Sequence, residues 1–200
     1  VQASLLPDIS FIKGKTVEQQ QLQSILRLRE LAVRQKTASG NQLKALLLEF
    51  NIRVSSRNGG LGGVIESVLE NAENEFSMAF REALNAAWQH HLVLIKSIAT
   101  YDRCLESSIE QHEDCKRLLK LEGVGVINAV NLYIALGCAD LGSFLKGKDA
   151  SACIGLTPIQ YTSGGKVKLG SIGRYVKNSL LRSQLITGAM SAVAQVCKRT

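Results

Sequence analysis

The pattern that most constrains the fold is a set of apolar residues that recur about every 3.5 residues within positions 75–117. This spacing predicts one long helix with a single apolar seam, as in a coiled coil. An earlier helical pattern starts at a capping box over Thr16–Gln19 and extends to Phe50, with Ser39-Gly40 as a candidate interruption. We therefore expect the two helices to form an antiparallel helical hairpin. The predicted seam residues are Leu84, Trp88, Leu92 (or His91), Ile95, Ile98, Leu105 and Ile109.

Glycine-rich sequence separates the two helical patterns at residues 51–63, which contain Asn58-Gly59-Gly60 and Gly62-Gly63. Such clusters predict a loop, and we expect a short helix over residues 64–71 after it. Residues 1–14 show no helical pattern and are expected to form an irregular lead-in. The predicted organisation is therefore this lead-in, a helical coiled-coil region at 15–117 that acts as a spacer or oligomerisation arm, and a C-terminal domain at 118–200.

Basic residues are concentrated in the C-terminal part of the chain. Residues 116–200 contain 12 Lys and Arg against three Asp and Glu, a net charge of +9, whereas residues 1–115 carry a net charge of −2. Such an excess favours a polyanionic partner, although a lysine-rich solvated surface has the same composition.

The chain has neither an apolar run long enough to span a bilayer nor a signal-peptide pattern at its start. Its five cysteines are scattered along the sequence, and no two of them have Cys-x-x-Cys spacing. Its three histidines do not combine with them at the spacing of a zinc site. We therefore expect reduced thiols, a cytoplasmic location and no membrane partner.

Residues 118–136 contain a helical pattern on either side of Gly123-Val124-Gly125. This arrangement predicts a helix-hairpin-helix motif, in which Gly123 and Gly125 allow a tight turn and present backbone amides to a DNA phosphate. Contacts of this kind position DNA without reading its sequence. The alternative is an αα-corner, in which the glycines let two helices pack closely.

A β-hairpin is predicted at 159–170, where apolar and polar residues alternate on both sides of Gly164-Gly165. Gly-Gly between two such strands is typical of a type I′ turn, whose two central residues need positive φ angles. The turn presents the hydroxyl of Ser163 beside Lys166 and Lys168. This combination suits contact with a phosphodiester, and it also suits an ordinary surface turn.

Two further helices complete the expected C-terminal domain. A short helix over residues 148–154 ends at Gly155, before the hairpin, and a last helix spans about 173–197. The fold class is therefore mainly α: a long antiparallel coiled-coil arm, followed by a small helical domain with a helix-hairpin-helix and one β-hairpin. The last helix carries the basic residues Arg174, Lys177 and Arg182 and an apolar face that includes Leu181, Leu185 and Met190.

Four short motifs occur in an order that resembles one protein family. They are Leu-x-Gly-Val-Gly at 121–125, Gly-Leu-x-Pro at 155–158, Ser-Gly-Gly-Lys-x-x-Leu-Gly at 163–170 and Leu-Leu-Arg-x-x-Leu-Ile-x-Gly-Ala at 180–189. Together they resemble the C-terminal transposase domain of the DEDD insertion-sequence transposases, the Piv/MooV-type, bridge-RNA-guided recombinases. The segments Lys15–Gln20, Arg27–Leu31 and Asn41–Lys44 are similar to the middle region of that family.

The resemblance implies a transposase that exchanges DNA strands through a covalent 5′-phosphoserine, and the family's nucleophilic serine matches Ser163. It also implies DNA, a guide (bridge) RNA and further copies of the chain as partners. The family holds Mg²⁺ through four acidic residues of a RuvC-like domain, and these acids have no matching positions here. We therefore expect no metal site in this chain and no activity without that domain.

One segment departs from the family pattern. The family has Gly-Asp or Gly-Asn before the Leu-Arg of the last helix, whereas this chain has Tyr175–Asn178.

An alternative function is a non-catalytic helix-hairpin-helix module that binds DNA and carries an oligomerisation stalk. The candidate nucleic-acid-binding residues are Gly123, Gly125, Gly164, Gly165, Lys166, Lys168, Arg174, Lys177 and Arg182.

Overall fold

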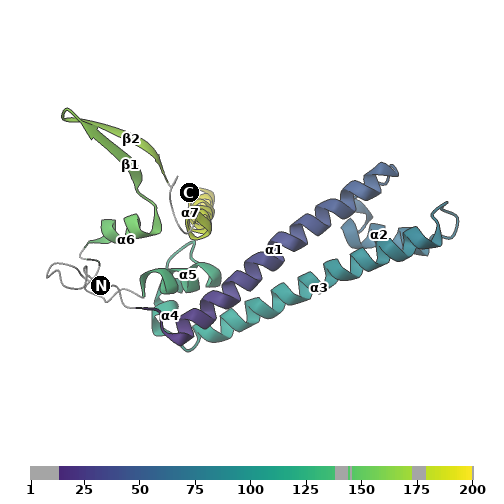
Figure 1. Cartoon of the computed structure of the whole chain (residues 1–200), viewed down its shortest axis with the longest axis horizontal. Helices are drawn as coiled ribbons and strands as arrows, with labels where there is room; N and C mark the ends of the chain where they lie inside the picture. The colour runs from purple at the N-terminus through teal and green to yellow at the C-terminus, as the bar shows by residue number, and fades with distance from the viewer. Residues whose placement is uncertain (1–13, 138–143, 145, 173–178, 200) are drawn as a thin grey trace, which may run out of the picture. The chain divides into compact units, whose positions relative to one another are not determined.

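The structure is a computed structural model that describes residues 14–137, 144, 146–172 and 179–199. These residues form seven α-helices, one 3-10 turn and one two-stranded antiparallel sheet (Figure 1). The predicted fold class, mainly helical with one β-hairpin, is confirmed. The chain divides into two compact units, which we describe separately. The arm unit contains residues 27–104, and the hairpin unit contains residues 1–26 and 105–200.

Helix α1 (Val17–Glu49) begins at the predicted capping box. The backbone N–H of Gln19 donates to Thr16 Oγ1 at 3.2 Å, and the backbone N–H of Thr16 donates to Gln19 Oε1 at 3.1 Å. Two amides that lack an acceptor within the helix are satisfied in this way. The sequence therefore predicted the start of α1 correctly.

The predicted interruption of α1 at Ser39-Gly40 is wrong, because the helix is continuous there. Ser39 Oγ is hydrogen-bonded to His91 Nδ1 of helix α3 (Met78–Ile109) at 2.8 Å. A Cβ atom on Gly40 would lie 3.1 Å from His91 Cε1. The two small residues are thus explained by the close approach of the His91 ring, and not by a break in the helix.

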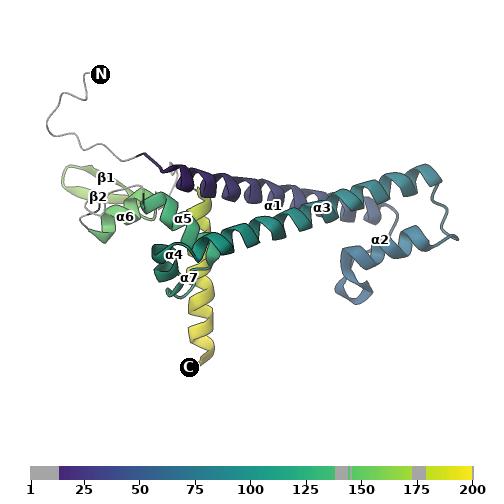
Figure 2. The same cartoon turned by 90° about the horizontal axis from the view of Figure 1, so that it is seen from below.

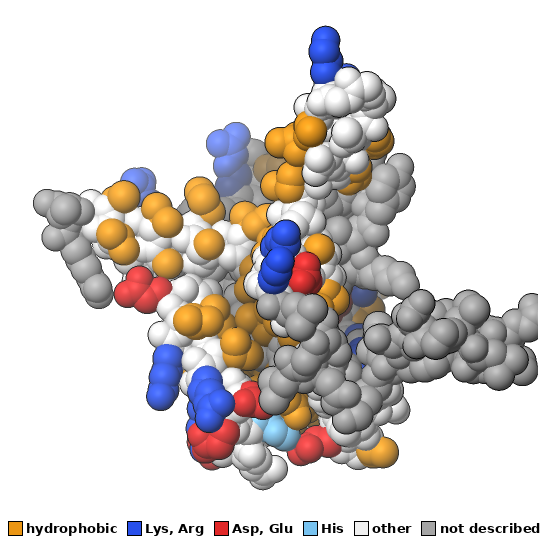
Figure 3. Space-filling model, turned by 90° about the vertical axis from the view of Figure 1, so that its left-hand side faces the viewer, with side chains coloured by type: hydrophobic (Ala, Val, Ile, Leu, Met, Phe, Trp, Pro, Cys, Tyr) orange, Lys and Arg blue, Asp and Glu red, His pale blue; other side chains and the backbone are white. Residues whose placement is uncertain are grey.

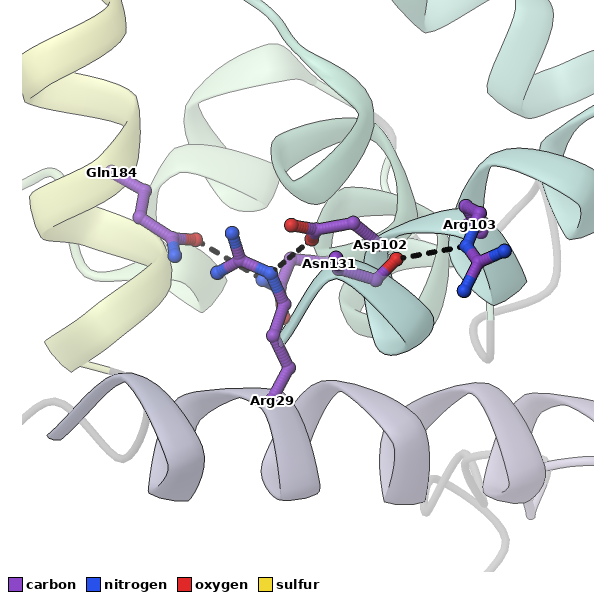
Figure 4. Close-up of polar contacts among 6 residues, drawn as sticks. Arg29, Asp102, Arg103, Asn131 and Gln184 are labelled. Atoms are coloured by element: carbon purple, nitrogen blue, oxygen red, sulfur yellow. Dashed lines mark hydrogen bonds and ion pairs between the residues drawn. The ribbon is translucent and has the colours of Figure 1, made fainter. Parts of the chain in front are cut away.

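Helices α1 and α3 run antiparallel within the arm unit, as predicted (Figures 1 and 2). Near the start of α1, Arg29 Nε donates to the carboxylate of Asp102, which lies near the end of α3 (Figure 4). Further along α1, Ser39 contacts His91. Later residues of one helix therefore meet earlier residues of the other.

The predicted seam of α3 is correct at both ends and wrong in the middle. Leu84, Trp88 and Leu105 are buried, but Ile95 is 43% exposed and its neighbour Leu94 is only 7% exposed. At the position where the sequence left two alternatives, His91 is buried. Adjacent residues of an α-helix point about 100° apart. Apolar spacing does not determine how two helices are rotated about their axes, so it did not distinguish position 94 from position 95.

The loop predicted at residues 51–63 is shorter than expected, because helix α2 (Gly60–Glu70) already begins at Gly60, after a 3-10 turn at Ser56–Asn58. Gly59 caps α2 with a φ of 78°. A Cβ on Gly62 would lie 3.4 Å from the Trp88 ring, and one on Gly63 would lie 2.9 Å from the carbonyl oxygen of Asn58. Gly62 and Gly63 therefore let α2 pack closely against the Trp88 ring and the Asn58 carbonyl.

The arm unit has its own apolar core, to which α1, α2 and α3 all contribute. Arg81 of α3 closes the C-terminal end of α2, since its guanidinium donates to the carbonyl oxygens of Leu69 at 3.0 Å and Asn71 at 2.7 Å. These are carbonyls that a helix end leaves without a partner. The buried core residues are Leu43, Leu47, Val64, Ile65, Val68, Leu84 and Trp88.

In the hairpin unit, the helix predicted to reach residue 117 ends at Ile109, and α4 (Glu113–Leu119) follows. His112 lies between them in an extended conformation (φ −117°) and caps α4. Its ring packs on Tyr133 of α5 (Val126–Leu136), with 5.0 Å between the ring centroids. The change of direction lets Cys115 enter the core, where it is fully buried.

The remaining elements of this unit are α6 (Gly147–Ile154), β1 (Pro158–Ser163), β2 (Lys166–Ile172) and α7 (Ser179–Arg199). Helix α6 ends at Gly155 (φ 80°), as predicted. Leu181 of α7 is fully buried, but Met190 is 68% exposed, so the predicted apolar face does not extend that far into the core. Within the described residues, no helix is both long and apolar enough to cross a membrane.

Candidate nucleic-acid interface

The β-hairpin has the predicted two-residue turn. Gly164 and Gly165 connect β1 to β2 with φ angles of 58° and 76°. Two successive positive φ angles define the type I′ turn, whose twist matches that of the flanking strands. Nothing lies within 4 Å of a Cβ placed on either glycine, so these positions require glycine for the backbone conformation and not for lack of space.

Strand pairing decides which side chains share a face of the hairpin. Ser163 pairs with Lys166, and Tyr161 pairs with Lys168. Residues directly opposite each other in an antiparallel pair point to the same side, and so do residues two apart along one strand. Ser163, Tyr161 and both lysines therefore lie on one face, which we call the serine face. All four residues are exposed.

Tyr161 is a residue of the serine face that the sequence analysis did not select. A Cβ on Gly170 would lie 3.1 Å from Tyr161 Cε2, so the ring lies close to Gly170, where a larger side chain would interfere. Tyr161 is nevertheless 58% exposed. The signal was present in the sequence, because Tyr161 is two residues from Ser163 in an alternating strand.

Exposed apolar side chains accompany the basic ones on the hairpin. On the face opposite Ser163, Val167 and Leu169 are 58% and 64% exposed. Figure 3 shows a basic side chain at the tip of the hairpin, at the top of the view, with hydrophobic side chains below it. The hairpin thus presents charge, an aromatic ring and apolar surface together.

The two glycines of the predicted helix-hairpin-helix have different surroundings. Gly123 (φ 80°) lies against α7: a Cβ on Gly123 would be 2.4 Å from the carbonyl oxygen of Gly188. Gly125 caps α5 without a side-chain hydrogen bond, and a Cβ there would have nothing within 4 Å. Close helix packing, the alternative reading of the motif, therefore explains Gly123. The backbone at Gly125 is open, and its contact with a phosphate stays a prediction.

Polar contacts hold α7 against α5. Asn131 Nδ2 donates to Gln184 Oε1 at 3.1 Å (Figure 4). Asn128 Nδ2 donates to the Gln184 carbonyl oxygen at 3.3 Å. Two residues before Gln184, the partly buried Arg182 has a different environment. Its Nη1 atom is buried and has no hydrogen-bond partner in the described part of the chain. A buried guanidinium nitrogen without an acceptor is costly, and an anion would satisfy it.

Some predicted site residues cannot be placed. Arg174 and Lys177 lie outside the described residues, as does Cys138. The four cysteines that the structure describes are thiols that do not take part in a disulfide. Among the described residues, no group of three or more His, Cys, Asp and Glu side chains is arranged to hold a metal ion.

The C-terminal part of the chain matches a known family. Residues 115–200 match the family described as "Transposase IS116/IS110/IS902 family". This segment is therefore similar to a domain of that transposase family. It contains most of α4, all of α5 to α7 and both strands of the hairpin, and so it includes Ser163, Gly123 and Gly188.

Similarity to transposases extends over the whole chain. The transposase for insertion sequence element IS1111A of Coxiella burnetii is 30% identical over 199 residues, which cover 100% of this chain and 54% of that protein. The transposase for insertion sequence element IS1328 of Yersinia enterocolitica is 31% identical over 181 residues, covering 90% of this chain and 53% of that protein. A probable family 20 transposase of Pseudomonas aeruginosa is 29% identical over 201 residues, covering 100% and 58%.

The chain spans about half the length of the curated relatives that it matches. No solved structure matches it. The chain is thus similar to insertion-sequence transposases, as the sequence motifs predicted. The nucleophilic serine, the acidic residues and the guide RNA stay predictions.

Proposed function

We propose that this chain is part of a transposase that carries out DNA transposition, and that Ser163 is its nucleophile. The observation that carries the proposal is the match of residues 115–200 to a transposase family, with Ser163 inside that segment. Two features of the hairpin support it. Ser163 is exposed directly before the Gly164-Gly165 turn, and its strand partner is Lys166.

The proposed chemistry is a transesterification at a DNA phosphodiester. Ser163 Oγ attacks phosphorus, so that an Oγ–P bond forms and the P–O3′ bond breaks. The serine gives up its proton, and the departing oxygen gains one to become a 3′-hydroxyl. The 3′-hydroxyl of a second strand then attacks the phosphoserine, joins the exchanged strands and restores the serine. The number of phosphodiester bonds is conserved, and no external energy source is needed.

The serine face supplies groups suited to holding the reacting strand. Lys166 and Lys168 place positive charge on the same side as the serine hydroxyl, where it can neutralise phosphate oxygens. Tyr161 presents an exposed ring on that face, and aromatic rings stack on bases without regard to their sequence. A serine hydroxyl needs activation at neutral pH. No carboxylate or imidazole occurs in the hairpin sequence, so the activating group belongs elsewhere.

Several partners are part of the proposal. Mg²⁺ would be held by acidic residues in the portion of the relatives that this chain does not span, and so we expect the chain alone to be inactive in strand exchange. A guide RNA and further copies of the protein are the other partners, as the resemblance implies. Gly125, Arg182 and the glycines of the turn are proposed to contact nucleic acid.

The test uses a full-length protein that contains this chain, with guide RNA, Mg²⁺ and end-labelled DNA. After denaturation, a protein–DNA adduct should remain with the wild type and disappear with Ser163→Ala. Ser171→Ala is the matched control, because Ser171 is an exposed serine of the same hairpin. An adduct that persists in Ser163→Ala, or that is lost in Ser171→Ala alone, removes Ser163 from this role.

A second candidate function is a DNA-binding module without catalysis, favoured by the open backbone at Gly125. Both functions require the 200-residue chain to bind DNA or structured RNA, with an affinity that falls steeply as salt rises. Only the transposase requires the adduct. Salt-dependent binding together with no adduct in the complete system would therefore favour the binding module.

A further inference from the structure

The arm unit contains a cavity of about 530 Å³ that the proposed reaction does not use. It is bordered by α1, the turn after α1, the start of α2 and His91 of α3. Its lining includes two lysines, a histidine and several side chains with hydroxyl or amide groups, but no aspartate or glutamate. The residues that matter here are Lys36, Asn41, Lys44, Ser55, Ser56 and His91.

The two lysines lie on one stripe of α1. Lys36, Gly40 and Lys44 are spaced four residues apart, so they follow each other along the same side of the helix. Gly40, between them, has no side chain, and the His91 ring occupies that space. Along α1, the two lysines thus lie on either side of the position that the His91 ring occupies, and all three side chains line the same cavity.

His91 is held in a fixed position. It is 7% exposed, its Nδ1 is hydrogen-bonded to Ser39 Oγ at 2.8 Å, and its ring stacks on Trp88 with 5.4 Å between centroids. Burial lowers the pKa of His91, and the positive charges of Lys36, His90 and Lys44 lower it further. Lys36 and Lys44 thus act on His91 in the same direction as burial, and they bring two positive charges to a lining without a carboxylate.

The opposite wall adds hydroxyl groups. Ser55 and Ser56 are exposed serines of the turn that leads into α2, and the Ser55 hydroxyl donates to Asn58 Oδ1 at 3.2 Å. The start of α2 lines the cavity through Gly60 and Leu61, and the Gly60 N–H donates to the Ser55 carbonyl oxygen at 3.0 Å. Hydroxyl groups, ammonium groups and the positive end of a helix are the groups that bind phosphate oxygens in proteins.

We propose that this cavity binds a phosphate group of a nucleic-acid backbone. That the phosphate belongs to nucleic acid rests on the proposed function, whereas an anion site between Lys36, Lys44 and His91 does not. The site lies in the arm unit and carries no candidate nucleophile from the hairpin. It would fix the strand at a second point without reading its sequence.

The first experiment tests the anion site alone, with inorganic phosphate as the probe and the 200-residue chain. The Cε1–H signal of His91 is followed by NMR and assigned with His91→Gln; His112, outside the cavity, is the internal reference. Phosphate should shift the His91 signal in the wild type and leave it unmoved in Lys36→Gln/Lys44→Gln. Chloride at equal ionic strength controls for general screening. A His91 signal that phosphate does not move, or moves equally in the double variant, overturns the anion site.

The second experiment tests the source of the phosphate, with fluorescently labelled single-stranded DNA and RNA of one sequence and a DNA duplex. Lys36→Gln/Lys44→Gln should weaken binding about tenfold and reduce the slope of log affinity against log salt by about one. Arg27→Gln/Lys96→Gln is the matched control: it removes the same charge from exposed positions of α1 and α3 outside the cavity. The three nucleic acids show which strand the site prefers.

The two experiments separate the two claims. A phosphate shift with equal nucleic-acid affinity in both double variants would retain the anion site and overturn its assignment to nucleic acid. Nucleic-acid affinity that falls in hairpin variants such as Lys166→Gln/Lys168→Gln, but not in Lys36→Gln/Lys44→Gln, would also overturn the assignment of the cavity to nucleic acid. It would leave the proposed function intact. Circular dichroism of each variant checks that the helices are unchanged.

Discussion

Gly123 and Gly188 lie backbone to backbone, one in the turn before α5 and the other in α7. A Cβ on Gly188 would be 2.1 Å from the Gly123 carbonyl oxygen, and a Cβ on Gly123 would be 2.4 Å from the Gly188 carbonyl oxygen. Two motifs that the sequence analysis treated separately, Leu-x-Gly-Val-Gly and Leu-Ile-x-Gly-Ala, are thus two sides of one contact. The contact fixes α7 against the turn of the helix-hairpin-helix.

Gly188→Ala should therefore destabilise the hairpin unit. The added methyl group meets backbone, which cannot rotate away, so we expect a loss of roughly 1–3 kcal/mol, as for an overpacked core. Gly147→Ala is the control, since a Cβ at Gly147 has nothing within 4 Å. Urea denaturation of both variants measures the difference. Equal stability of Gly188→Ala and wild type would contradict the close contact.

The corrected seam of α3 predicts opposite results for two neighbouring residues. Leu94→Asp places a carboxylate at a buried position and should cost several kcal/mol, because a buried charge without a partner is strongly unfavourable. Ile95→Asp changes a largely exposed residue and should cost less than about 1 kcal/mol. Thermal melting of the pair compares identical chemistry at adjacent sites. A larger loss in Ile95→Asp would restore the seam predicted from the spacing.

Arg81→Gln should weaken the arm unit, because the guanidinium satisfies carbonyls at the end of α2 that glutamine cannot reach together. Hydrogen bonds from a charged donor contribute about 1.5–3 kcal/mol each, so we expect a loss of at least about 2 kcal/mol. Arg34→Gln, at an exposed position of α1, is the control. A comparable stability change in both variants, measured by urea denaturation, would show that Arg81 does not hold this helix end.

The sequence predicted the elements that depend on local chemistry. The capping box at Thr16, the end of α6 at Gly155 and the turn at Gly164-Gly165 each follow from residues a few positions apart. A side-chain oxygen near free amides, or a residue that tolerates positive φ, gives the same structure in many proteins. These predictions needed no knowledge of the tertiary contacts.

The features that failed depend on contacts between distant residues. In the sequence, Ser39-Gly40 resembled a helix break. The residue that explains these two small side chains is His91, which is 51 residues further along the chain than Gly40. Gly62 and Gly63 resembled a loop for the same reason, since they make room for Trp88 and for the Asn58 carbonyl. At the hairpin, alternation placed Ser163 correctly, but the shared face with Tyr161 required the register of the strands.

The thiols should differ sharply in reactivity. Burial raises the pKa of the Cys115 thiol to about 11, with a smaller contribution from the negative charge of Asp114. At pH 8 only about one thiol in a thousand would be thiolate, the reactive form, and the side chain is also inaccessible. Iodoacetamide at pH 8 should label the exposed Cys153 and spare Cys115, as read by mass spectrometry. In urea both should react, and labelling of Cys115 in the folded protein would contradict its burial.

Stability should depend on the protonation of His91. Burial lowers its pKa below the ordinary value of 6.5, and Lys36, His90 and Lys44 act in the same direction. Below pH 6.5 the unfolded chain therefore binds a proton that the folded chain resists. This contribution to stability is present above pH 6.5 and is lost as the pH falls through the lower pKa of the folded state.

The measurement is the free energy of unfolding in urea between about pH 7.5 and pH 5.5, above the range in which most carboxylates titrate. The wild type should lose stability toward the acid end, and His91→Gln should remove that slope even though it also lowers stability at every pH through lost packing on Trp88. His90→Gln, at an exposed position of the same helix, should keep most of the slope. Inorganic phosphate should reduce the slope in the wild type if the cavity binds it, because a nearby anion favours the protonated ring. A slope that is identical in wild type and His91→Gln would assign the pH dependence to another group.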